Sequence, residues 1–159
     1  MDNNSREVGP GNQETEDKKP LNILLVEDDK SIVPLIERVF NGHKITVFDN
    51  AEQALEELRK NQKLGVFFDW IITDKGLKGK MDGFDLAKAV KEDRLGNPFV
   101  TLLTGSAVQV QDQNTAQQLR EKGIHQLMGK PFDIKQLKNS VNDAREFNKQ
   151  SQVPQASKI

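Results

Sequence analysis

Strand-like and helix-like patterns alternate five times between residues 22 and 147, and this alternation limits the possible folds more than any other feature. The strand patterns are short apolar runs bounded by polar or turn residues, as expected of a sheet that is buried on both faces. They cover residues 22–26, 67–74, 98–103 and 124–128, and a run of alternating character at 44–48 predicts a further strand nearer an edge of the sheet. Short connections between alternating strands and helices predict a parallel sheet with right-handed crossovers and helices on both faces. The sequence therefore predicts a doubly wound α/β domain.

The helix patterns have apolar residues spaced three or four positions apart. They follow Ser31, follow Asp49 or Asn50, and then cover about residues 83–93, 112–122 and 134–147. We expect the side chains of Ser31, of Asp49 or Asn50, and of Asp133 to cap three of these helices, because their oxygens can accept the free N–H groups of a first turn. The pattern at 112–122 is weak, and Gly123 is a natural residue to end that helix.

Composition excludes several classes of protein. The 159 residues include 23 Lys and Arg against 24 Asp and Glu, which gives a formal net charge of −1 and argues against a general nucleic-acid binder. Cysteine is absent, so neither a disulfide framework nor thiolate chemistry is expected. No apolar run approaches the roughly 18 residues of a membrane span, and the N-terminus lacks the apolar core of a signal peptide. We therefore expect a cytoplasmic protein without a membrane partner.

The two ends of the chain are polar. Residues 1–20 have almost no large apolar groups, so we expect a disordered N-terminal arm. The ordered domain should cover residues 21–147, and residues 148–159 should form a flexible C-terminal tail. We expect no further output domain after the last helix, because only about a dozen residues follow it.

Charged and hydroxyl side chains gather where the predicted strands end. Glu27 and Asp28 follow the first strand, and Asp74 ends the third. Thr104 follows the fourth strand, and Lys130 follows the fifth. Because parallel strands place their carboxyl ends at one edge of the sheet, we expect these residues to meet there. Three carboxylates repel one another, so Mg²⁺ with oxygen ligands and retained waters is the natural partner, with Lys130 as a second counter-charge.

Such a site suits a phosphoryl group. A metal ion and an ammonium group would neutralise the charge on the equatorial oxygens of that group. The Thr104 hydroxyl would donate a hydrogen bond to one of these oxygens, and Gly105 leaves room beside it. One aspartate can then act as nucleophile and form an acyl phosphate, with positioning supplying most of the acceleration.

Five short motifs at or just after the predicted strand ends resemble those of the receiver domain of bacterial two-component response regulators, the CheY-like family. They occupy residues 24–29, 71–74, 81–83, 103–105 and 130–132. The resemblance covers about residues 21–147, and the motifs are specific only as a set in this order. It implies a CheY/flavodoxin-like sheet of five parallel strands in the order 2-1-3-4-5.

The resemblance also implies a role for each acidic site residue. Asp74 matches the phosphoacceptor and Asp28 the acid that binds Mg²⁺ directly. Glu27 matches the acid that acts mostly through water. Gly76 matches the position whose backbone carbonyl ligates the metal. Asp29 falls outside this acid pair and is expected to form a turn or a cap.

The resemblance assigns the remaining site residues in the same way. Thr104 matches the switch hydroxyl, and Lys130 matches the phosphate-binding lysine. The bond between Lys130 and Pro131 is expected to be cis, as is usual in the family. The family's switch aromatic, three residues before the lysine, is Leu127 here, so the usual coupling between the threonine and an aromatic ring is not expected in its standard form.

The loop between Asp74 and Gly83 departs from the family pattern. It is one residue longer than usual, and Lys78, Gly79 and Lys80 stand where the family has a proline. We expect a longer, more basic and more flexible loop, whose lysines could attract an anionic partner.

Three other polar residues are expected to be structural. Asp69 would start its strand at the end opposite the site. His43 and His125 lie away from the strand ends that carry the site, so we expect satisfied or surface histidines rather than ligands.

Taken together, the resemblance implies a stand-alone receiver that takes a phosphoryl group from a phosphohistidine on a sensor histidine kinase or a histidine phosphotransfer protein. It would catalyse its own phosphoryl transfer and dephosphorylation without turning over an external substrate, and would signal by binding an unknown protein target.

Two alternatives remain open. One is a pseudo-receiver that keeps the fold and signals without phosphate, which Leu127 and the altered loop favour. The other is a flavodoxin-like cofactor binder, which shares the sheet order. Such a binder needs Gly, Ser or Thr to present backbone N–H groups to phosphate, whereas the acids at residues 27–29 would repel phosphate unless a metal intervened.

Overall fold

The computed structural model describes residues 19–151 of the chain. Within this part, five parallel strands form one sheet in the order β2-β1-β3-β4-β5, which confirms the predicted fold class. The strands are β1 (Asn22–Val26), β2 (Lys44–Phe48), β3 (Trp70–Asp74), β4 (Phe99–Thr104) and β5 (Gln126–Gly129). The helices are α2 (Val33–Val39), α3 (Ala51–Lys63), α4 (Gly83–Glu92), α5 (Ala107–Gln113), α6 (Ala116–Glu121) and α7 (Ile134–Ser151).

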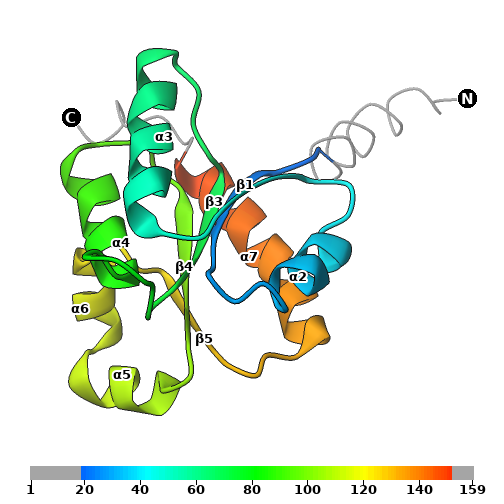
Figure 1. Ribbon diagram of the computed structural model, residues 1–159, viewed down its shortest axis with the longest axis vertical. Coiled ribbons are helices and arrows are strands. Elements are labelled where there is room, and N and C mark those ends of the chain that lie inside the picture. The colour runs from blue at the N-terminus through cyan, green and yellow to red at the C-terminus, as the bar shows by residue number, and fades with distance from the viewer. Residues whose placement is uncertain (1–18, 152–159) are drawn as a thin grey trace, which may run out of the picture.

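Helices cover both faces of the sheet, as Figure 1 shows: α2 and α7 lie on one side, and α3, α4, α5 and α6 on the other. Each face has its own apolar core, because successive residues of a strand point to opposite faces. Leu24 and Val26 of β1 pack on the side of α3 and α4, whereas Ile23 and Leu25 pack on the side of α2 and α7. The central strands are therefore apolar on both faces, as the sequence pattern predicts.

The third strand is shorter than the apolar run that predicts it. It begins at Trp70, while Phe67 is 45% exposed and lies against the Gly96 turn. Asp69 lies directly before β3 and joins it to the start of β1. Its carboxylate accepts the Asn22 N–H at 2.8 Å, and its own N–H donates to the Asn22 carbonyl at 2.8 Å. The expected structural role of Asp69 is thus confirmed.

The prediction that Ser31 caps α2 is wrong. Helix α2 begins at Val33, and its N-cap residue, Ile32, makes no capping hydrogen bond with its side chain. The hydroxyl and the N–H of Ser31 instead donate to Asp29 Oδ1, at 2.6 and 3.0 Å. An aspartate two residues upstream competes for the polar groups of Ser31 and forms a local turn. The predicted turn role of Asp29 is therefore confirmed.

The weak helix pattern at 112–122 corresponds to two short helices. Helix α5 ends at Gln113, and α6 begins after Thr115, whose side chain forms a reciprocal capping box with Gln118. A threonine three residues before a glutamine is a start signal, and it interrupts the pattern here. Gly123 follows α6 with a φ of +87°, as expected of a residue that ends a helix.

The cap of α7 is as predicted, and of the two candidates for α3, Asp49 and Asn50, it is Asn50 that caps the helix. Asn50 accepts the Gln53 N–H at 2.8 Å, and Asp133 accepts the Lys135 N–H at 3.1 Å. Helix α7 continues to Ser151, so residues 148–151 are helical rather than part of the predicted tail. The rest of the predicted arm and tail, residues 1–18 and 152–159, lies outside the described residues. No helix in the described part of the chain has the length and apolar character needed to cross a lipid bilayer.

Candidate functional site

The central strand β3 delivers Asp74 to the carboxyl edge of the sheet. All five residues of β3 are buried between β1 and β4, and Asp74 itself is 8% exposed. The Lys75 N–H donates to the Leu103 carbonyl at 2.7 Å, which extends the pairing with β4 past the end of the strand. The backbone that carries the Asp74 carboxylate is therefore held on both sides.

Gly83 closes the loop that follows Asp74. Its N–H donates to the Lys75 carbonyl at 2.9 Å, so the loop at residues 75–82 begins and ends beside the carboxyl end of β3. A Cβ at this position would lie 2.3 Å from the Asp74 carbonyl oxygen and 2.8 Å from Leu102 Cδ1. Only glycine fits so close to the β3 backbone, so this residue lets α4 begin directly against the strand that carries Asp74.

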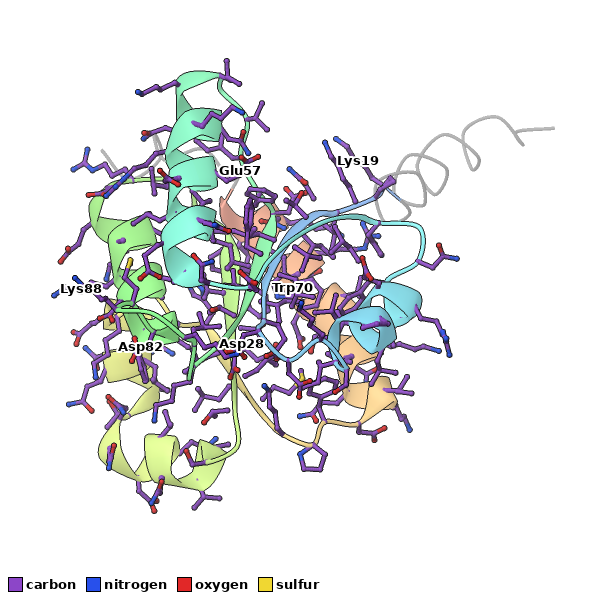
Figure 2. The ribbon with its side chains drawn as sticks, in the orientation of Figure 1. Lys19, Asp28, Glu57, Trp70, Asp82 and Lys88 are labelled. Carbon is purple, nitrogen blue, oxygen red and sulfur yellow. The ribbon has the colours of Figure 1, made fainter. Side chains whose placement is uncertain are left out.

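The end of β1 brings two further acids to Asp74. Glu27 is 1% exposed and Asp28 is half-buried. One carboxylate oxygen from each of Glu27, Asp28 and Asp74 can be chosen so that all three lie within 4.8 Å of one another. In Figure 2, Asp28 lies at the end of β1, between the two helical layers. Three acids from two neighbouring strands thus form one cluster, as the edge rule for parallel sheets predicts.

Lys130 provides a positive charge for this cluster. Its Nζ lies 2.7 Å from Glu27 Oε1 and 3.1 Å from Asp74 Oδ2. The Lys130 N–H donates to the Thr104 carbonyl at 2.9 Å, which extends the pairing of β4 and β5 to the lysine. The bond between Lys130 and Pro131 is cis, as predicted.

Burial and charge act against each other in this pocket. Burial raises the pKa of Glu27, while the Lys130 ammonium and the Asp29 N–H partly offset this effect. Burial alone would lower the pKa of Lys130, but its hydrogen bonds to Glu27 and Asp74 outweigh burial and raise it. Lys130 is thus held in its charged form beside carboxylates that are costly to keep ionised.

The residues of the cluster fit a divalent cation. The three donors are carboxylates, the hard oxygen ligands that Mg²⁺ prefers. A single lysine leaves most of their negative charge uncompensated. Gly76, two residues beyond Asp74, is exposed on the adjoining loop.

Thr104 lies at the end of β4 with its hydroxyl turned to Ser106. The Thr104 Oγ1 accepts the Ser106 N–H at 3.1 Å and lies 3.2 Å from the Ser106 hydroxyl. A Cβ added at Gly105 would have nothing within 4 Å, so the space beside Thr104 is open. Leu127 pairs with Leu102 in the sheet and packs, partly buried, against the core on the side of α3 and α4.

Two contacts around the site could not be predicted from the sequence. The Ser106 side chain engages Thr104. Glu52, in the first turn of α3, accepts the Lys80 N–H at 2.9 Å and so binds the loop that was expected to be flexible. The sequence signal at Glu52 was only an acid in a first helical turn, which the helix dipole explains without any loop.

Both histidines are structural, as predicted. His43 Nδ1 accepts the Leu21 N–H at 2.9 Å, and His125 Nδ1 accepts the Val100 N–H at 3.0 Å. The His125 ring also stacks on Phe99 and packs at a tilt against Phe147, with centroid distances of 5.8 and 4.4 Å.

Fold and pocket together define a doubly wound α/β protein with an acidic, lysine-bridged pocket at the carboxyl edge of its sheet. The family model of the response regulator receiver domain matches residues 23–142. The chain belongs to the response regulator receiver domain family, which places it in two-component signalling and confirms the resemblance in the sequence.

Known relatives agree with this assignment. The heme response regulator HssR of Staphylococcus saprophyticus is 30% identical over 116 residues, which cover 72% of this chain and 46% of that protein. The chain therefore spans about half the length of this curated relative.

Solved structures share the fold. A putative response regulator from Chloroflexus aurantiacus is 25% identical with a TM-score of 0.65, over 80% of this chain and 99% of that one. The chemotaxis response regulator CheY4 of Vibrio cholerae is 22% identical with a TM-score of 0.67, over 79% of this chain and 99% of that one.

Proposed function

We propose that Asp74 accepts a phosphoryl group from a phosphohistidine on a sensor histidine kinase or a histidine phosphotransfer protein. The phosphorylated domain then signals by binding a protein target. The observation that carries this proposal is the position of Lys130, whose ammonium lies between Glu27 and Asp74 in a cluster of three carboxylates. In this proposal Glu27, Asp28, Asp74 and the Gly76 carbonyl would hold Mg²⁺.

The transfer needs little covalent chemistry from the protein. An oxygen of the Asp74 carboxylate attacks phosphorus, and the bond between phosphorus and the imidazole nitrogen breaks with its electron pair passing to the ring. The ring leaves as neutral imidazole, because its other nitrogen carries a proton taken from solvent. Lys130 moves from Asp74 Oδ2 to a phosphoryl oxygen and keeps its hydrogen bond to Glu27. When bound, Mg²⁺ supplies charge neutralisation at the phosphoryl oxygens. The same pocket later admits water that hydrolyses the acyl phosphate on Asp74. Both reactions take place on the protein's own side chain, so no external substrate is turned over.

The Thr104 hydroxyl is the remaining donor of the site. It leaves Ser106 and donates to a phosphoryl oxygen, and the open space beside Gly105 accommodates the group. This movement alters the start of α5, which follows Ser106 directly. The change in α5 and in the adjoining β5 is the signal that a partner protein recognises.

Intact-mass measurement after incubation with acetyl phosphate and Mg²⁺ tests the chemistry. The wild-type chain should gain one phosphoryl group, and Asp74→Ala should gain none. The exposed Asp112→Ala is the matched control and should be modified like wild type. An unmodified wild type, or a modified Asp74→Ala, contradicts the proposal.

A pseudo-receiver is the second candidate, because Leu127 replaces the family's aromatic residue and Ser106 already engages the Thr104 hydroxyl. Beryllofluoride with Mg²⁺ separates the two candidates, since it mimics a phosphoryl group on Asp74. A receiver that works by phosphorylation should bind it and gain thermal stability, whereas a pseudo-receiver should show the same melting temperature with and without it.

A further inference from the structure

The loop at residues 75–82 is bound to the rest of the protein at its middle as well as at its ends. At its ends, the Gly83 N–H donates to the Lys75 carbonyl at 2.9 Å. At its middle, the Lys80 N–H donates to Glu52 Oε2 at 2.9 Å. Glu52 and Lys80 are 28 residues apart in the sequence, so this hydrogen bond joins α3 to the loop that follows Asp74.

Gly79 brings the loop backbone against the Glu52 carboxylate. Its φ is +100°, and a Cβ there would lie 2.8 Å from Oε2 and 3.0 Å from Oε1 of Glu52. A residue with a side chain would therefore be strained in its backbone and would push the flexible Glu52 carboxylate away from the loop. Glu52 Oε1 is shielded from solvent and makes no hydrogen bond with the described residues, so the loop covers the carboxylate closely.

The electrostatics of this contact agree with the geometry. The Lys80 N–H lowers the pKa of Glu52, and the Glu52 and Met81 N–H groups and the Lys80 charge act in the same direction, against the effect of burial. The carboxylate is thus charged at neutral pH and faces successive backbone N–H groups of the loop, an arrangement that holds anions in proteins.

We infer that Glu52 is a positioning residue of the phosphoacceptor site, which holds the loop at residues 75–82 and so restricts the backbone of Gly76, whose carbonyl is the proposed Mg²⁺ ligand. The inference rests on the proposed function, because it concerns the Mg²⁺ site that the function needs. A loop with exposed glycines at positions 76 and 79 has many conformations, and the hydrogen bond to Glu52 removes many of them.

Two variants of Glu52 and one control test this role in the full chain. Glu52→Ala removes the acceptor, Glu52→Gln keeps an oxygen that can accept the Lys80 N–H, and Glu56→Ala removes an exposed acid one turn further along α3. The dissociation constant of Mg²⁺ is measured by titration calorimetry, and protection of the Lys80 amide is measured by hydrogen exchange without Mg²⁺.

In Glu52→Ala the Lys80 amide should exchange faster, and the dissociation constant of Mg²⁺ should rise about tenfold, as is typical when a residue that orients a metal ligand is lost. Glu52→Gln should stay within about threefold of wild type, and Glu56→Ala should match wild type. An unchanged dissociation constant in Glu52→Ala overturns the positioning role, and so does an equal rise in Glu56→Ala. A wild-type chain that binds no Mg²⁺ overturns the proposed metal site itself.

Discussion

The Nζ of Lys130 lies 2.7 Å from Oε1 of Glu27, and this ion pair connects the end of β5 to the end of β1 across 103 residues of sequence. The Glu27 side chain is fully buried, and that of Lys130 is 20% exposed. A buried carboxylate without a partner destabilises the folded state, so the stability of this pocket depends on the ion pair between Lys130 and Glu27.

Replacement of Lys130 by Met should therefore destabilise the protein. The acids would lose their counter-charge inside the pocket, and the free energy of unfolding should fall by about 2 kcal/mol without Mg²⁺. Urea unfolding measures this difference, with the exposed Lys138→Met as the control. Mg²⁺ should stabilise Lys130→Met more than wild type, because a cation that binds the folded state then replaces a missing charge. Equal stabilisation of both proteins by Mg²⁺ would argue against a shared cation site.

Gly83 provides a second test of the site. Alanine at this position would place a Cβ 2.3 Å from the Asp74 carbonyl oxygen, so the start of α4 or the end of β3 must shift. We expect a loss of about 2 kcal/mol in the free energy of unfolding and slower phosphorylation of Asp74. Gly105→Ala is the matched control, because a Cβ there has open space, and it should change the free energy of unfolding far less. Similar losses for the two variants would show that crowding at Asp74 is not the cause.

The general layout of fold and site could be predicted from the sequence because it depends on local patterns. The runs at 22–26 and 44–48 match β1 and β2 residue for residue. After Asn22, β1 is apolar and buried, as expected of a central strand, whereas β2 alternates in character, as expected of a strand at the sheet edge. Once the sheet is parallel, the residues after its strands share one edge, and this rule alone brings Glu27, Asp74 and Lys130 together.

The parts that could not be predicted depend on competition or on distance. Ser31 can cap a helix, but its hydroxyl instead donates to Asp29, two residues upstream. Residue propensities do not say whether a serine will form a helix cap or a local turn. The hydrogen bond between Glu52 and Lys80 joins segments whose separation depends on how α3 packs beside α4. Sequence patterns identify which residues are charged, but they do not measure the distance between two elements.

His125 should make the stability of the protein depend on pH. Burial is the main cause that lowers the pKa of His125 to about 4, and the Lys91 and Arg120 charges add to it. The unfolded chain, with an ordinary pKa of about 6.5, binds more protons between these values, so the contribution is present above pH 6.5 and is lost as pH falls toward 4. The expected loss is about 2 kcal/mol after allowance for solvent screening.

Urea unfolding at several pH values checks this expectation against His125→Gln. The variant cannot gain a proton at this position, so its stability should vary less between pH 6.5 and 4 than that of wild type. His43→Gln is a useful comparison, because burial also lowers the pKa of His43, but its ring meets Phe40 edge-on, whereas that of His125 stacks on Phe99. If His125→Gln and wild type show the same pH dependence, another group is responsible.

The three lysines of the loop after Asp74 should speed the encounter with an anionic phosphodonor protein. Lys78 and Lys80 are exposed and Lys75 is half-buried, all within six residues of Asp74, the proposed phosphoacceptor. Exposed charges attract a partner over about 10 Å at 0.1 M salt and over much less at 1 M salt. Replacement of all three by Gln should slow phosphorylation several-fold at low salt and leave the rate at high salt unchanged. The control replaces Lys60 and Lys63 of α3 by Gln, and stopped-flow or quenched transfer assays from the phosphorylated donor give the rates. An equal rate for the loop variant and wild type at low salt would show that these lysines do not guide the donor.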